Sequence, residues 1–255
     1  MYRASTLAAA IGIVALAAAC TSSGAGGREV RITQREDGCT PTSIPVTAGE
    51  KLKLVVQNES KKDYELEGID GTSLQEMIVP EGRTRTPGYT VPSGAGIHKI
   101  KCYVPAGVST VIELVATDSA ASAASGATAS PTAANSPVGA ATSGASTQSA
   151  TSVAVTLVEY SVTADKPSVT AGTIRFIATN VSSAEVHELY VLKAKPDGTF
   201  DKLGEIPAIA PQKGGSIELD LAPGAYTLAC LIVPGEAGST VDHYQQGMHT
   251  PFTVK

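Results

Sequence analysis

The sequence predicts an all-β protein: two Greek-key β-sandwiches joined by a disordered linker. In both halves of the chain, short segments rich in β-branched residues are bounded by Gly or Pro, which is typical of sandwich strands. Outside the N-terminal apolar run, no long stretch repeats its apolar residues with a helical period. Between the halves, residues 119–152 contain only Ala, Ser, Thr, Gly, Pro, Asn, Gln and Val, which leaves too little bulky apolar surface to fold.

Residues 1–20 have the features of an export signal. Arg3 provides a positive charge, and the apolar run from Leu7 to Leu16 is too short to span a membrane as a mature helix. Three Ala residues then precede Cys20, an arrangement that resembles the bacterial lipobox. The resemblance implies lipidation at Cys20, a flexible tether over residues 21–27, and an extracytoplasmic protein anchored to the cell membrane.

The linker separates two halves, residues 28–118 and 153–255, and neither of them is basic. The first half carries 11 basic and 13 acidic side chains, and the second half carries 7 basic and 11 acidic side chains. Nucleic acid is therefore not an expected partner.

Short signatures recur in the same order in the two halves. Val-Thr-Ala-Gly occurs at 46–49 and again at 169–172, and Asn58 is matched by Asn180. At the same offset from these asparagines, Glu65 falls on His187, and the later Cys102 parallels Cys230. Several signatures repeated in order predict a duplicated domain.

Cysteine counting leaves one thiol over in the exported chain. With Cys20 set aside for lipidation, Cys39, Cys102 and Cys230 remain, and an odd thiol in an exported protein needs a function. Cys230 lies in the last third of the chain, where three of the four histidines are also found.

Four potential metal ligands follow one another in this last third. They are His187, Cys230, His243 and Met248. Two imidazoles and a thiolate with a weak axial thioether form the donor set of a blue-copper centre, whereas Zn²⁺ rarely uses Met. The pattern predicts one type 1 copper ion, and an empty site or another metal is the alternative.

These residues carry a resemblance to a known family. The order Asn180, His187-Glu188-Leu189, residues 222–230 ending in Cys230, and His243-x₄-Met248 is similar to that of the cupredoxins, the plastocyanin-like β-sandwiches. The resemblance implies that His187, Cys230, His243 and Met248 bind copper and that residues 153–255 form a cupredoxin domain.

The chain departs from compact cupredoxins in the twelve residues between Cys230 and His243. His249 is the rival for the second imidazole. His243 is preferred because the His-x₄-Met spacing lets both donors face one side of a turn, whereas His249 directly follows Met248 and would point away.

Residues 28–118 resemble the cupredoxin-like domain of bacterial periplasmic iron-uptake proteins. The shared features are residues 37–41, 58–60 and 65–67 and the Lys-Cys pair at 101–102. The resemblance implies a second metal site with Cys39, Glu65, Glu67 and Cys102 as candidate ligands. A Cys39–Cys102 disulfide is an equally weighted alternative.

Three functions are compatible with this organisation. The first is a membrane-tethered one-electron carrier that serves an unidentified redox partner. The second is a copper or iron binding and delivery protein without redox turnover, and the third is an interaction module that needs no metal. An enzyme is not expected, because four histidines cannot supply both a blue site and a trinuclear copper cluster.

Overall fold

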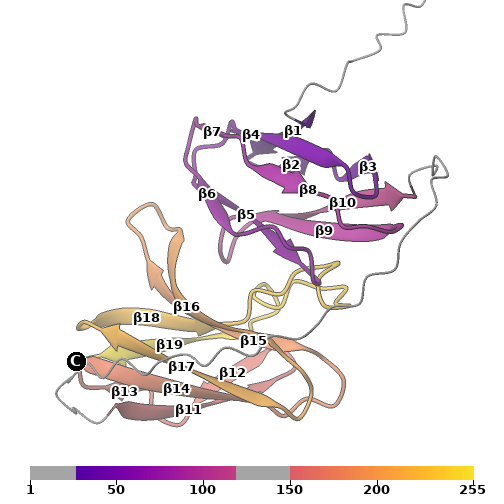
Figure 1. The fold of residues 1–255 in the computed structure, drawn as a ribbon. Helices are drawn as coiled ribbons and strands as arrows, with labels where there is room; N and C mark the ends of the chain where they lie inside the picture. The colour runs from indigo at the N-terminus through magenta and orange to yellow at the C-terminus, as the bar shows by residue number, and fades with distance from the viewer. Residues whose placement is uncertain (1–26, 119–149) are drawn as a thin grey trace, which may run out of the picture.

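The computed structural model describes residues 27–118 and 150–255, and these residues form two β-sandwich units (Figure 1). Within these ranges there is no helix, and therefore none that could span a membrane. The predicted signal segment with Cys20, the tether up to residue 26 and linker residues 119–149 lie outside the described residues. The predicted all-β fold class with two sandwiches is confirmed.

The first unit contains two five-stranded sheets. One sheet joins β2 (Gly38–Thr40), β1 (Arg28–Arg35), β4 (Lys51–Asn58), β7 (Thr84–Arg85) and β8 (Gly88–Thr90). The other sheet joins β3 (Ser43–Thr47), β10 (Ser109–Thr117), β9 (Gly96–Tyr103), β5 (Tyr64–Ile69) and β6 (Met77–Val79). The chain crosses between the two sheets several times. For example, β2 and β3 follow each other in sequence but belong to opposite sheets.

The second unit repeats this plan. Its first sheet joins β12 (Ser161–Ala164), β11 (Thr151–Val158), β14 (Gly172–Asn180) and β17 (Gly214–Leu221). Its second sheet joins β13 (Ser168–Val169), β19 (His249–Val254), β18 (Gly224–Ala229), β15 (His187–Ala194) and β16 (Phe200–Ile209). Strand β11 begins two residues inside the predicted linker, because Thr151 and Ser152 already pair with Ile174 and Arg175 of β14.

Alternating burial explains why these segments form strands. In β11, the side chains of Val153, Val155 and Leu157 point into the core while the residues between them face outward. In β1, Val30 and Ile32 do the same. A period of two places all the apolar side chains of a strand on one face, where the opposite sheet removes them from water.

Strand pairing supports the internal duplication. β1 pairs with β4 in parallel, with Gln34 opposite Asn58, and β11 pairs with β14 in parallel, with Leu157 opposite Asn180. The two asparagines have three side-chain hydrogen bonds in common. Each donates from Nδ2 to two backbone carbonyls, both at 2.8 Å, and accepts from a serine N–H two residues later at 2.9 Å.

One predicted correspondence needs correction: Glu65 does not occupy the place of His187. Tyr64 pairs with Val79, whose carbonyl accepts from Asn58, and His187 pairs with Ile209, whose carbonyl accepts from Asn180. The loop before His187 is one residue longer than its counterpart, as the amide bonds to the carbonyls of residues 62 and 185 show. Tyr64 is therefore the equivalent of His187.

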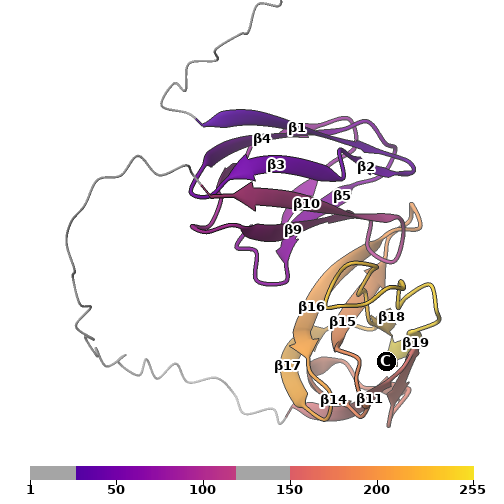
Figure 2. The same cartoon turned by 90° about the vertical axis from the view of Figure 1, so that its right-hand side faces the viewer.

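The two units meet through their equivalent second sheets and through the loop between β18 and β19, which lies against the first unit (Figures 1 and 2). Lys202 of β16 lies 2.8 Å from a carboxylate oxygen of Glu65 in β5. Lys101 of β9 donates to the carbonyl of Leu231 in the loop at 2.8 Å. Charged side chains therefore occupy the buried part of this interface.

Candidate metal centre

Three elements of the second unit bring the candidate donors together. His187 is the first residue of β15, Cys230 directly follows β18, and His243 lies in the loop that connects β18 to β19. All three side chains are 0% exposed. The end of the sandwich thus holds a water-excluded group of one thiol and two imidazoles.

The donor atoms are spaced as a single ion requires. His187 Nδ1 and His243 Nδ1 lie 3.3 Å apart, and Cys230 Sγ lies 3.4 Å from His243 Nδ1. One potential ligand atom from each residue falls within 4.8 Å of the other two. Three ligands at about 2.0–2.3 Å from an ion in one plane would stand roughly 3.5–3.8 Å apart. The residues therefore fit a trigonal metal ion with little rearrangement.

The tautomer of His243 is fixed by Ser239. The Ser239 hydroxyl donates to the carbonyl of Val241 at 2.9 Å, so its oxygen accepts from His243 Nε2 at 3.1 Å. The ring proton is then on Nε2, and the lone pair on Nδ1 faces Cys230 and His187. This second bond orients the imidazole for metal binding, as is usual for metal-binding histidines.

Burial keeps both imidazoles neutral. It lowers the pKa of His187 to about 4, with a smaller contribution from repulsion between the two imidazoles when both are protonated. It also lowers the pKa of His243, an effect that the positive charge of Lys101 increases. Neutral imidazoles offer lone pairs at physiological pH. Among the described residues, His187 Nε2 has no hydrogen-bond partner.

Cys230 is the one cysteine outside a disulfide in the described residues. Burial raises the pKa of its thiol, and the negative charge of Glu188 raises it further. Without a metal, the thiol is therefore protonated at neutral pH. A metal cation would displace that proton and take the thiolate as ligand.

Met248 packs in the hydrophobic core together with Cys230, and its side chain is buried. Its backbone carbonyl accepts from the Cys230 N–H at 3.0 Å, and its N–H donates to the His243 carbonyl at 2.9 Å. Both bonds hold Met248 near the site, and its role as the axial donor stays a prediction.

The rival imidazole, His249, lies outside this group. It is the first residue of β19, its side chain is exposed, and its ring stacks on Tyr244 with centroids 4.4 Å apart. His249 pairs with Ala229 and lies on the same face of the sheet as that residue. Because successive side chains of a strand face opposite sides, this face is the one turned away from the core. The structure favours His243 over His249.

In the first unit, Cys39 and Cys102 form a disulfide, which decides between the two predicted alternatives. The two sulfurs are therefore not available as metal ligands, and the structure favours the disulfide over the metal site with Glu65 and Glu67. The carboxylates instead face Lys202, which lies 2.8 Å from Glu65 and 3.6 Å from Glu67.

Sequence reasoning missed the buried cations. Lys101 is 0% exposed, although it lies in an alternating strand next to a core cysteine, where a lysine normally faces solvent. The sequence carries no sign that another unit covers this strand. Glu188 was part of the family pattern but had no assigned role, and its Oε1 accepts from the Leu231 N–H at 3.0 Å.

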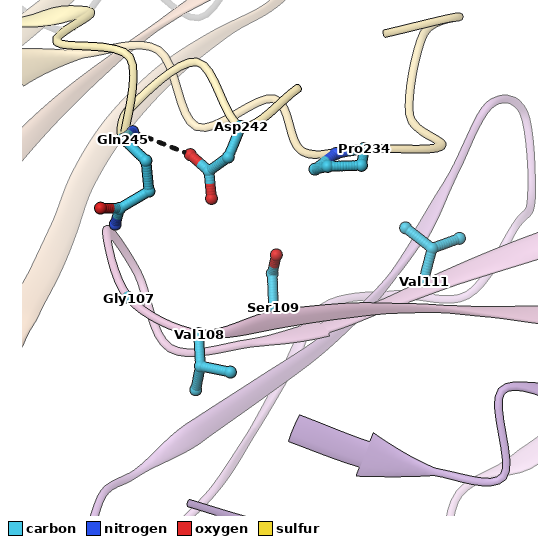
Figure 3. A pocket seen from close by; sticks show the side chains of 7 residues that line it. All are labelled: Gly107, Val108, Ser109, Val111, Pro234, Asp242 and Gln245. Atoms are coloured by element: carbon cyan, nitrogen blue, oxygen red, sulfur yellow. Dashed lines mark hydrogen bonds between the residues drawn. The ribbon is translucent and has the colours of Figure 1, made fainter. Parts of the chain in front are cut away.

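An open groove of about 630 Å³ lies between the two units (Figure 3). Gly107 to Ser109 and Val111 form one wall, and Pro234, Asp242 and Gln245 of the β18–β19 loop form the other. Gln245 donates from its backbone to Asp242 Oδ1 at 3.0 Å. None of the three donors lines this groove.

Comparisons with known proteins give remote likenesses only. No protein-family model and no curated protein matches the chain. The chain is similar to dithionite-reduced auracyanin from Roseiflexus castenholzii at 20% identity, over 42% of this chain and 98% of that chain, with a TM-score of 0.33. A Cu-containing nitrite reductase from Thermus scotoductus is 14% identical over 89% of this chain and 62% of its own, with a TM-score of 0.30.

A blue copper oxidase from Nitrosomonas europaea is similar at 13% identity, over 89% of this chain and 86% of that chain, with a TM-score of 0.30. Likenesses this remote carry no argument about metal or activity. The assignment of the site therefore depends on the donor atoms of this chain: two neutral imidazoles and one thiol, enclosed together at the end of a β-sandwich.

Proposed function

We propose that the second unit binds one copper ion through His187, Cys230 and His243, with Met248 as the axial donor, and carries single electrons. The observation that supports this proposal is the convergence of one thiol and two imidazoles within 4.8 Å in a fully buried site. Such a donor set suits type 1 copper better than it suits zinc or iron.

Hydrogen bonds within the chain hold the residues of the proposed site in place. Ser239 orients His243, and the backbone bonds of Cys230 and Met248 tie the two ends of the loop together. Bound copper would supply a one-electron couple between Cu(II) and Cu(I). A donor set that cannot relax keeps the reorganisation small between the two states.

The proposed carrier is tethered to the membrane. The proposal is based on the lipobox-like run before Cys20 and the linker 119–152, which would give the second unit reach. A Cys20→Ser variant is expected to move the protein from the membrane fraction to the soluble fraction of cells. Membrane association that survives this change would contradict lipid anchoring at Cys20.

One observation favours a second candidate, copper binding for storage or delivery without redox turnover. All three donors are 0% exposed, so no ligand edge reaches the surface in the described residues. A reversible one-electron wave would favour the carrier, and tight copper binding without such a wave would favour storage or delivery.

The test uses the full chain with Cys20→Ser for purification. Added Cu(II) is expected to give an intense visible band and the narrow copper hyperfine splitting of a type 1 site in electron paramagnetic resonance. Both signals should be lost in Cys230→Ser and His243→Ala, and retained in His249→Ala as the matched control. A colourless wild-type protein in the presence of Cu(II) would refute the proposed function.

A further inference from the structure

A buried lysine of the first unit reaches the metal-binding loop of the second. Lys101 Nζ donates to the carbonyl of Leu231 at 2.8 Å and lies 2.9 Å from Oε2 of Glu236. Lys101 belongs to β9, and its side chain is 0% exposed. The contact therefore joins two units that are distant in sequence at the residue directly after Cys230.

The backbone of Leu231 is held through both its N–H and its carbonyl. Its N–H donates to Oε1 of Glu188, the residue that follows His187, at 3.0 Å. Its carbonyl accepts from Lys101. The backbone next to the thiol is thus fixed between a neighbour of the first imidazole and a cation from the other unit.

A second chain of contacts leads from Lys101 to the other imidazole. Glu236 accepts from the Val233 N–H through its carboxylate at 3.1 Å and from the Ser239 N–H through its carbonyl at 2.8 Å. Ser239 in turn accepts from His243 Nε2. Moving Glu236 would shift the serine that orients His243.

The ammonium group is retained in its charged form inside the interface. Burial by itself lowers the pKa of Lys101, but three surrounding carboxylates outweigh burial and raise it overall. Its Nζ also lies 4.6 Å from the centre of the Tyr103 ring. A buried charge of this kind is costly unless its partners stay in place, so it favours one fixed arrangement.

We propose that Lys101 is a positioning residue that the first unit supplies to the metal centre of the second, and that metal binding and docking of the two units are therefore coupled. The inference rests on the proposed copper site. Docking would hold the Leu231 peptide and Glu236, and copper binding would strengthen docking by the same factor, because coupling is reciprocal. The cation would also favour the reduced, less positive ion.

The test compares Lys101→Met with Lys99→Met in the full chain carrying Cys20→Ser. Lys99 is a matched control, because it donates to the same loop, at Gly235, at 2.6 Å and pairs with Asp70, but contacts neither Leu231 nor Glu236. Lys101→Met is expected to weaken copper binding by about 10- to 100-fold, to lower the reduction potential and to change the copper hyperfine splitting. Lys99→Met should leave all three within about twofold of wild type.

Lys101→Gln separates the hydrogen bond from the charge. Its amide can still donate to Leu231, so it should recover part of the copper affinity but not the potential. Small-angle scattering of the copper-free variants reports docking without any metal signal. Weakened copper binding in Lys101→Met supports the inference, whether or not the units separate.

Two results would overturn the inference. One is a Lys101→Met protein whose affinity, potential and spectrum match those of Lys99→Met. The other is a variant with separated units and an unchanged copper site. A wild-type protein that forms no type 1 site would refute the proposed function instead, so the two failures are distinguishable.

Discussion

The two sandwiches place a cysteine at the same point and use it in opposite ways. In the first unit, Cys102 pairs with Leu66 across the sheet. In the second unit, Ala229 pairs with Tyr190, so the next residue, Cys230, lies opposite Leu189, the equivalent of Leu66. Cys102 is closed in a disulfide with Cys39, whereas Cys230 is a buried thiol between two imidazoles. A shared scaffold therefore does not decide the chemistry of this position.

Few differences separate the two outcomes. Gln34 faces Cys39 across β1 and β2, and its counterpart Leu157 faces Val162 across β11 and β12. The second unit thus has no sulfur opposite Cys230. Tyr64 is replaced by His187, and the tight β9–β10 turn is replaced by the long loop that brings His243 and Met248 to the site.

The largest expected effect comes from giving the second unit the missing sulfur. Val162→Cys places a thiol where Cys39 stands in the first unit, and Val162 and Cys230 share one core cluster. In the oxidised variant, the introduced thiol is expected to form a disulfide with Cys230 and to abolish copper binding, because the thiolate ligand is consumed. Copper titration followed by visible absorption measures the loss.

Reduction of the new disulfide, with the reductant then removed under nitrogen, should restore copper binding. Val162→Ala is the control, since it opens space without adding a sulfur. If oxidised Val162→Cys keeps its copper band, the structural equivalence of Cys39 and Val162 is wrong.

A smaller effect is expected from the paired asparagines. Asn58→Ala removes four side-chain hydrogen bonds and Asn180→Ala removes three, and we expect each change to lower the free energy of unfolding by about 3 kcal/mol. Urea unfolding of the copper-free protein, followed by circular dichroism, measures this loss.

The asparagine variants should differ in copper binding. Asn180 holds the segment before His187, so Asn180→Ala should speed copper loss, whereas Asn58→Ala should not. Equal copper dissociation rates in the two variants would show that this segment does not depend on Asn180 for its position.

The smallest expected effect is the release of protons when copper binds. At pH 7 the Cys230 thiol is protonated because burial raises its pKa, while His187, with a pKa of about 4, is neutral, as is His243. Binding of one Cu(II) should therefore release about one proton, and copper affinity should rise roughly tenfold per pH unit between about pH 5 and 8. Below that range, protonation of His187 should steepen the dependence.

Calorimetric titrations in two buffers with different ionisation enthalpies give the proton number directly. Oxidised Val162→Cys serves as the control and should release none. Release of two protons would mean that one imidazole is charged in the metal-free protein.

Local sequence patterns were sufficient for much of the fold. Alternation in segments such as Leu52 to Gln57 predicted strands because the side-chain period of a strand is two, and the repeated Asn58 and Asn180 revealed the duplication. The one-residue difference in the loops before Tyr64 and His187 misled the alignment of the halves, because offsets in sequence do not reveal where an extra loop residue lies.

By itself, the sequence determined the all-β class, the two halves and the choice of His187, Cys230 and His243, since donor types and strand periodicity are local properties. Only the tertiary structure decided that Cys39 and Cys102 are bridged and that His249 faces outward. It also decided the burial of Lys101 against the metal-binding loop. These outcomes depend on distances between segments far apart in the chain, which packing sets and no local pattern records.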